Sequence, residues 1–204
     1  MNTGIKIKMC GLSRPCDIEK VNELRIDYIG FVFAPKSKRY VSLEKARELK
    51  KLLDPKIKAV GVFVKEDAET VANLLEKGII DIAQLHGGED ESYIQKLRSL
   101  TSKPIIKAFR IDSAEDVEKA NKSTADFILL DSGNGGTGTT FDWSLLRSIS
   151  RPFFLAGGLD VNNVKEAAKT LAPYAVDVSS GIETNGLKDE NKMTAFVKKV
   201  RNDI

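Results

Sequence analysis

The sequence has little cysteine and little histidine. Its 204 residues include only two cysteines, Cys10 and Cys16, and a single histidine, His86. Two cysteines cannot form a disulfide framework, and a chain of this length can build a hydrophobic core without one. One histidine without a pair of suitably spaced cysteines lacks the ligand set of a zinc site. We therefore expect reduced thiols, a cytoplasmic location and no bound metal.

Long apolar runs and an excess of one charge are also missing. No stretch reaches the length of a membrane span, and residues 1–8 lack the apolar core of a signal peptide. The 32 Lys and Arg residues are interleaved with 29 Asp and Glu residues, which gives a net charge of only +3. Such interleaving is typical of solvated helix faces, so neither a membrane nor a nucleic acid is an expected partner. The small positive excess favours a small anionic ligand.

Short apolar runs recur along the chain, and no Gly/Ser-rich or Pro-rich linker divides it, so we expect a single domain spanning residues 1–204. Each run is followed by turn residues and then by a stretch with helical spacing. Successive runs begin roughly 22 to 29 residues apart, about the length of a strand, a helix and two connections. The eight predicted strands are Ile5–Met9, Tyr28–Phe33, Ile57–Val64, Ile80–Leu85, Pro104–Phe109, Phe127–Leu130, Phe153–Ala156 and Ala175–Val178.

Alternating strands and helices require a parallel sheet, either open and doubly wound or closed into a barrel. The count of eight strands favours a (β/α)8 barrel, the TIM barrel fold. A doubly wound sheet is the alternative, but Cys10-Gly11-Leu12 stands where its glycine-rich fingerprint is expected. The fifth and sixth connections have the weakest helical spacing, and we expect truncated elements in both.

Reactive and backbone-exposing residues follow the predicted strands. In a parallel barrel the ends of all strands share one rim, and barrel enzymes place their chemistry at that rim. This convergence predicts a functional site there. The residues are Cys10, Arg39, His86, Asp131, Gly157-Gly158 and Ser179-Ser180-Gly181.

The two segments after the last strands predict a phosphate site. Gly157 and Gly158 allow backbone N–H groups to approach an anion closely, and Ser179, Ser180 and Gly181 add hydroxyls and further amides. The loops after strands seven and eight form the usual phosphate site of such barrels. The competing interpretation is that the glycines only make a tight turn.

Each of the other rim residues has a structural alternative. Asp131 is placed to act as a general acid, but Asp also caps turns and helices. Cys10 follows a buried strand, where cysteine is usually a small core residue. Arg39 suits a ligand carboxylate through two parallel hydrogen bonds, but its loop is also basic enough to be merely solvated. Cys16, beside Pro15 at a predicted helix start, is expected to be structural.

Taken in order, eight groups of residues strongly resemble the phosphoribosylanthranilate isomerase family over nearly the whole chain. No single group is decisive, but their order and spacing are specific. One departure is Ala156, where many relatives carry serine. The groups are Lys8-Met-Cys10-Gly, Gly30-Phe-Val-Phe with Ser37-Lys38-Arg39, Val60-Gly-Val-Phe, Gln84-Leu-His86-Gly, Leu130-Asp131, Gly136-Thr-Gly138 with Phe141-Asp142-Trp143, Ala156-Gly-Gly-Leu159 and Val176-Asp177-Val-Ser-Ser-Gly181.

The resemblance implies an Amadori rearrangement of N-(5-phosphoribosyl)anthranilate to the 1-deoxyribulose phosphate, a step of tryptophan biosynthesis that needs no cofactor. It implies that Cys10 is the general base and Asp131 the general acid. Arg39 matches the position that binds the anthranilate carboxylate. His86 and Asp177 match positions that line the pocket, and the segments around Gly157 and Ser179 match the phosphate site. The expected partner is the small-molecule substrate, and the chain is expected to be a monomer or a homodimer.

Two other functions are compatible with such a barrel. The aminoaldose isomerase of histidine biosynthesis performs related chemistry, but it carries Asp as the base on its first strand, where this chain has Cys10. A barrel that binds a phosphosugar without turnover is the alternative from another class. A protein that only binds would not need both Cys10 and Asp131.

Overall fold

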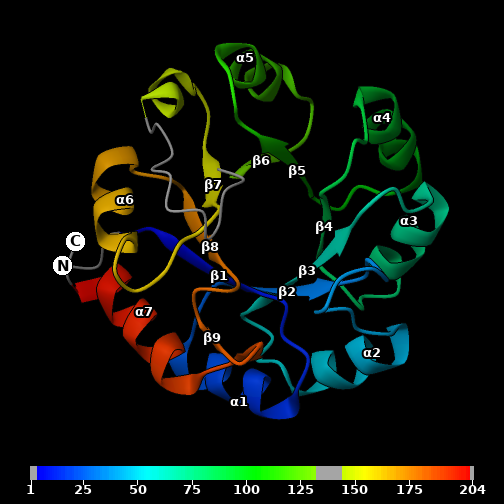
Figure 1. Ribbon diagram of the computed structural model, residues 1–204. Coiled ribbons are helices and arrows are strands. Elements are labelled where there is room, and N and C mark those ends of the chain that lie inside the picture. The colour runs from blue at the N-terminus through cyan, green and yellow to red at the C-terminus, as the bar shows by residue number, and fades with distance from the viewer. Residues whose placement is uncertain (1–3, 132–143, 203–204) are drawn as a thin grey trace.

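Eight parallel strands close into a barrel in the computed structural model, which describes residues 4–131 and 144–202. Each strand pairs with the next along the chain, and β1 also pairs with β8, so the doubly wound alternative is wrong and the predicted TIM barrel is confirmed. Figure 1 shows the strands at the centre and the helices in an outer ring. The strands are β1 (Lys6–Cys10), β2 (Tyr28–Val32), β3 (Lys58–Phe63), β4 (Ile82–Leu85), β5 (Ile105–Arg110), β6 (Phe127–Asp131), β7 (Phe153–Ala156) and β8 (Ala175–Val178).

The outer helices pack one apolar face on the strands, and most begin at a side chain that accepts a hydrogen bond from the first turn. Ser42, Asp67, Asp90 and Ser113 cap four of them in this way. No helix in the described ranges is both long and apolar enough to cross a membrane. The helices are α1 (Pro15–Leu24), α2 (Leu43–Leu52), α3 (Ala68–Glu76), α4 (Glu91–Leu100), α5 (Ala114–Lys122), the 3-10 helix η1 (Leu145–Ser148), α6 (Val164–Leu171) and α7 (Glu190–Asn202).

The two connections with weak helical spacing differ from one another. The prediction of a truncated fifth connection is wrong, because α5 is a regular helix of 9 residues. Val117 is the only apolar side chain larger than alanine in α5, so its buried face is only weakly marked in the sequence. In the sixth connection, the described residues contain only the 4-residue η1.

The barrel interior is filled at the amino-terminal ends of the strands and open at their carboxyl ends. Aromatic rings of Tyr28, Phe127, Phe154 and Tyr174 pack together at the filled end. The hydroxyls of Tyr28 and Tyr174 lie 2.8 Å apart, so these partly buried polar groups satisfy one another. A ligand therefore has access to the interior from the opposite rim.

A short hairpin follows β8 at this open rim. Its strands are β9 (Glu183–Thr184) and β10 (Leu187–Lys188), and they pair Glu183 with Lys188. The hairpin leads directly into α7. It thereby adds charged side chains to a rim that is otherwise made by the strand ends.

Candidate active site

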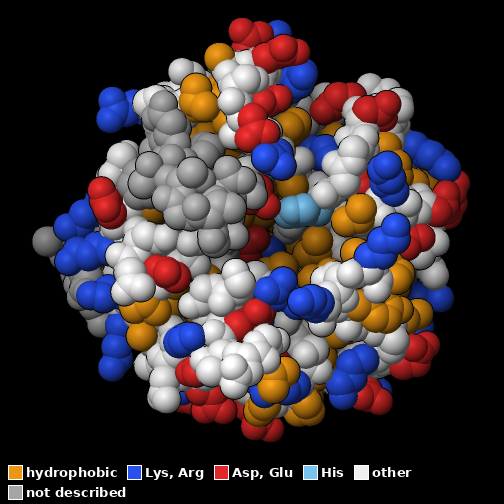
Figure 2. Space-filling view, in the orientation of Figure 1, with side chains coloured by type: hydrophobic (Ala, Val, Ile, Leu, Met, Phe, Trp, Pro, Cys, Tyr) orange, Lys and Arg blue, Asp and Glu red, His pale blue; other side chains and the backbone are white. Residues whose placement is uncertain are grey.

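A cavity of about 400 Å³ opens at the carboxyl ends of the strands. Figure 2 shows this hollow at the centre of the face, with histidine, acidic and basic side chains gathered around it. The cavity brings together nearly all of the predicted site residues. Those that line it are Cys10, Arg39, His86, Asp131, Gly157, Gly158, Asp177, Ser179 and Ser180.

Cys10 ends β1, one residue later than predicted, and points into the cavity. The β1–β2 register places it opposite Gly30, which has no side chain to compete for this space. Its backbone carbonyl accepts a hydrogen bond of 3.0 Å from Ser179 Oγ. The thiol is therefore held between β2 and the segment that follows β8, at the edge of the cavity.

Lys8 is a second functional group of β1 that the sequence did not single out. Alternation along the strand places it on the same side as Cys10, inside the barrel. Its ammonium is fully buried and lies 2.8 Å from Asp177 Oδ2. Asp177 Oδ1 is also buried, and within the described part of the chain it has no hydrogen-bond partner. Because Asp177 lines the cavity, this oxygen is placed to accept a hydrogen bond from a ligand.

The surroundings of Cys10 act on its thiol in opposite directions. Burial raises the pKa of the Cys10 thiol, and the Asp177 carboxylate adds to this rise. The ammonium groups of Lys8 and Lys188 lower the pKa, Lys8 the more strongly. Burial raises the pKa of Asp177 in turn, against the attraction of Lys8. The thiolate, the form that accepts a proton, thus depends on two lysines.

Asp131 ends β6 and faces His86 across the cavity. His86 Nε2 lies 3.4 Å from Asp131 Oδ2, and Gln84 Nε2 lies 2.8 Å from His86 Nδ1. Gln84 is buried within β4, so it holds the imidazole from below. When the Gln84 amide donates to Nδ1, the imidazole carries its proton on Nε2, the nitrogen nearer to Asp131. His86 therefore lies beside the carboxyl group that ends β6.

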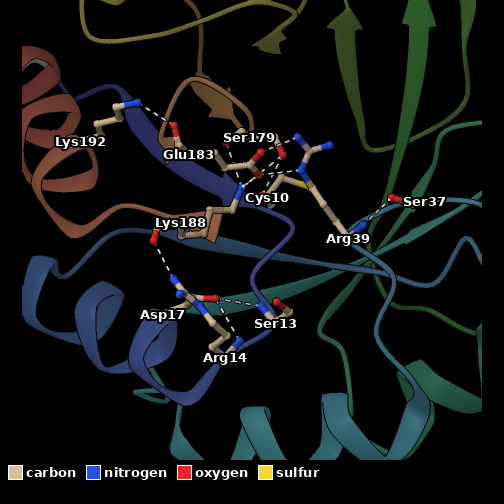
Figure 3. A network of polar contacts seen from close by, with 10 residues as sticks. All are labelled: Cys10, Ser13, Arg14, Asp17, Ser37, Arg39, Ser179, Glu183, Lys188 and Lys192. Atoms are coloured by element: carbon tan, nitrogen blue, oxygen red, sulfur yellow. Dashed lines mark hydrogen bonds and ion pairs between the residues drawn. The ribbon is translucent and has the colours of Figure 1, made fainter. Parts of the chain in front are cut away.

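Arg39 lines the cavity beyond β2 and forms two hydrogen bonds with one carboxylate. Its Nε and Nη2 donate to Glu183 Oε1 and Oε2 at 2.6 and 2.8 Å. Lys188 Nζ donates to the same Oε1 at 2.6 Å (Figure 3). Burial alone would raise the pKa of Glu183, but these two cations bring it below its ordinary value. The sequence did not indicate Glu183 or Lys188, because both lie in a polar hairpin.

The predicted phosphate segments face the cavity as adjacent loops. Gly157 and Gly158 follow β7 with φ angles of 92° and 62°, which side chains rarely adopt. Ser179 directs its hydroxyl hydrogen to the Cys10 carbonyl, and Ser180 lines the cavity beside it. Gly181 does not line the cavity. A Cβ atom there would lie 2.0 Å from the Leu159 carbonyl oxygen, so Gly181 lets the two loops pack together.

Within residues 4–131 and 144–202, no group of three or more His, Cys, Asp or Glu side chains is arranged to hold a metal ion. The segments Gly136-Thr-Gly138 and Phe141-Asp142-Trp143, which contributed to the resemblance, lie outside the described residues. The described residues supply this cavity with a thiol, a carboxyl group, an imidazole and two glycine-containing loops.

Comparisons with known proteins show the family of the chain. The family model described as N-(5'-phosphoribosyl)anthranilate (PRA) isomerase matches residues 7–199. The chain belongs to this family. The N-(5'-phosphoribosyl)anthranilate isomerase of Endomicrobium trichonymphae is 48% identical over 200 residues, covering 96% of this chain and 98% of the relative.

Solved structures of phosphoribosylanthranilate isomerases have the same fold. One shows monomers of the dimeric isomerase from Thermotoga maritima, with a TM-score of 0.83 and 36% identity. Another isomerase, in complex with reduced 1-(o-carboxyphenylamino)-1-deoxyribulose 5-phosphate, has a TM-score of 0.84 and 36% identity. Each comparison covers 96% of this chain and 98% of the other. The chain is thus an isomerase with the barrel fold of its family.

Proposed function

We propose that this isomerase converts N-(5'-phosphoribosyl)anthranilate to 1-(2-carboxyphenylamino)-1-deoxyribulose 5-phosphate, an Amadori rearrangement of tryptophan biosynthesis. One observation carries the proposal. A thiol from β1 and a carboxyl group from β6 line one cavity, together with Arg39 and an anion-binding loop pair. A substrate with a carboxylate at one end and a phosphate at the other fits this distribution of charge. Its reacting carbons then lie between Cys10 and Asp131.

Asp131 acts as the general acid in the first step. It donates its proton to the oxygen of the furanose ring while the bond from that oxygen to C1 breaks. The lone pair of the anthranilate nitrogen forms an iminium ion with C1. The His86 imidazole, 3.4 Å from Asp131 Oδ2, lies beside the carboxyl group that donates this proton.

Cys10 acts as the general base in the second step. The iminium ion makes the proton on C2 acidic, and the Cys10 thiolate removes it to give an enolamine. Tautomerisation then converts C2 to a ketone and adds a proton at C1. Oxidation of C2 and reduction of C1 balance within the substrate, so the reaction requires no external oxidant or reductant.

The remaining residues bind the two ends of the substrate. Arg39 binds the anthranilate carboxylate, and Asp177 accepts a hydrogen bond from a sugar hydroxyl through Oδ1. The phosphate binds at the two loops after β7 and β8, formed by Gly157, Gly158, Ser179, Ser180 and Gly181. The glycine pair supports this assignment, because both residues line the cavity and have no side chain to keep an anion away from the backbone.

We infer a cytoplasmic enzyme that acts as a single domain, as a monomer or a homodimer. A catalytic thiol requires a reducing compartment, and both Cys10 and Cys16 are free. The substrate is the expected partner, rather than a nucleic acid or a membrane. Sedimentation velocity over a range of protein concentrations distinguishes the monomer from the dimer.

The activity is tested with the purified chain and freshly prepared N-(5'-phosphoribosyl)anthranilate, by following the loss of substrate fluorescence. The aminoaldose substrate of histidine biosynthesis serves as the comparison. We expect turnover of the anthranilate substrate and growth of a tryptophan auxotroph that lacks this isomerase. Turnover of the histidine precursor alone would contradict the proposal, and tight ligand binding without turnover would identify a binding protein.

A further inference from the structure

Glu183 binds Arg39 from behind the substrate cavity. Arg39 is among the residues that line the cavity, whereas Glu183 is not, and the Glu183 side chain is only 9% exposed. The carboxylate uses the edge of the guanidinium formed by Nε and Nη2. It therefore does not occupy the place of a ligand. The Nη1 side of the guanidinium is the part left for a carboxylate that enters the cavity.

Glu183 is itself held firmly by its surroundings. Lys188 donates to its carboxylate at 2.6 Å and also to the Ser179 carbonyl at 2.9 Å. The Glu183 backbone N–H donates to the Ser180 carbonyl, and Lys192 Nζ donates to the Glu183 carbonyl at 2.6 Å (Figure 3). These bonds connect the hairpin to β8 and α7. Glu183 is thus a fixed support rather than a mobile surface side chain.

The aliphatic part of Arg39 is fixed at a second point. A Cβ atom at Gly11 would lie 2.4 Å from Arg39 Cδ, so the side chain passes closely over the glycine that follows Cys10. Gly11 has a φ angle of 79°, which also favours glycine. The stem is therefore confined beside the catalytic strand while the guanidinium is confined by Glu183. A long side chain that usually has many rotamers is restricted to one position.

The charges support the same role. Arg39 and Lys188 share the single negative charge of Glu183, so the cluster retains a net positive charge beside the cavity. Without Glu183, the two cations would repel one another and Arg39 would be released toward solvent. With it, the cluster attracts an anion and presents the guanidinium in one orientation.

We propose that Glu183 is a positioning residue that fixes Arg39 and so sets the preference of the enzyme for substrates with an anthranilate carboxylate. The inference rests on the proposed function, because it takes Arg39 as the residue that binds this carboxylate. Glu183 thereby joins the residues that determine substrate preference, although it makes no contact with the substrate. Its effect is on selectivity, which a merely structural residue would leave unchanged.

The test compares equilibrium binding of two ligands to the whole protein by calorimetry. One is reduced 1-(o-carboxyphenylamino)-1-deoxyribulose 5-phosphate, and the other is the same compound with a plain phenyl ring. In Glu183→Gln we expect the carboxylated ligand to bind about tenfold more weakly, since a charge-assisted contact is misaligned. The phenyl compound should bind as it does to the parent. In an Arg39→Ala background, Glu183→Gln should have no further effect.

A matched control is Glu89→Gln. Glu89 is also a buried carboxylate paired with a lysine, Lys107 at 3.2 Å, but it does not line the substrate cavity. It should leave the preference for the carboxylated ligand unchanged. Because Glu183→Gln leaves Lys188 without its counter-charge, a Glu183→Gln/Lys188→Gln variant removes both charges together. It keeps the test possible if the single variant does not fold, and it should show the same loss of selectivity.

The outcomes separate the two assignments. If Arg39→Ala abolishes the preference for the carboxylate and folded Glu183 variants retain it, the positioning role is overturned alone. Equal weakening of both ligands in the Glu183 variants would also overturn it. If Arg39→Ala itself leaves the preference intact, the carboxylate site proposed for Arg39 fails, and the inference fails with it.

Discussion

A Cβ atom at Gly30 would lie 2.6 Å from the sulfur of Cys10 and 3.0 Å from its Cα atom. The two residues are register partners on β1 and β2, so neither can move away without disturbing the barrel. The Cys10 thiol can therefore occupy its position only because Gly30 has no side chain.

Gly30→Ala should displace the Cys10 thiol and lower kcat. A misplacement of a reacting group by about 1 Å typically costs on the order of 10²-fold in rate. Affinity for inorganic phosphate, measured by calorimetry, should stay close to that of the parent, because the loops proposed to bind phosphate follow β7 and β8. Parent-like kcat in the alanine variant would show that the thiol position does not limit the reaction.

Cys10→Ala and Asp131→Asn should each reduce turnover by roughly 10² to 10⁴-fold, the usual contribution of a general base or acid. Deuterium exchange from solvent into C2 of the substrate separates their roles. Asp131→Asn should block ring opening and therefore exchange, whereas Cys10→Ala should open the ring but retain the C2 proton. Rapid exchange in the Cys10→Ala enzyme would identify another base.

Lys8→Met should raise the pKa of the Cys10 thiol, because the Lys8 ammonium opposes the effect of burial more strongly than any other group. The thiolate fraction at neutral pH then falls, and alkylation of Cys10 by iodoacetamide requires a higher pH. Asp177 also faces the Cys10 thiol, and its carboxylate raises the thiol pKa. Lys188 and Arg39 are the other charged groups near this thiol. The measurement is alkylation rate against pH in a Cys16→Ser background.

The control for this variant is Lys107→Met. Lys107 is also buried and paired with a carboxylate, that of Glu89, but it faces away from the barrel interior on β5. Its loss should reduce stability without moving the alkylation profile. A profile unchanged in Lys8→Met would show that Lys8 does not lower the thiol pKa.

Gly157→Val should weaken binding of substrate and inorganic phosphate together. Valine is strained at a φ angle of 92°, and its side chain would prevent an anion from reaching the backbone amides. Calorimetry with inorganic phosphate gives the result directly. Unchanged phosphate affinity in a folded variant would place the phosphate elsewhere at the rim.

The sequence by itself determined the eight strands and the rim on which the reactive residues gather. Apolar runs mark the strands, and a parallel arrangement places their carboxyl ends on one side, so Cys10, His86 and Asp131 could be assigned to one site. The predicted truncation of the fifth connection was wrong, because Val117 is the only apolar side chain larger than alanine in the helix there. A helix can be recognised in the sequence only when enough large apolar residues mark its buried face.

Tertiary structure alone decided which charges meet. Lys8 and Asp177 are 169 residues apart and Arg39 and Glu183 are 144 residues apart, and neither pair has a local signature. Closure of β1 against β8 brings the first pair together in the barrel interior, and the hairpin after β8 brings Glu183 behind Arg39. A lysine or glutamate in sequence is expected to be solvated, since burying a charge is costly without a partner. The partner is supplied only when the chain folds.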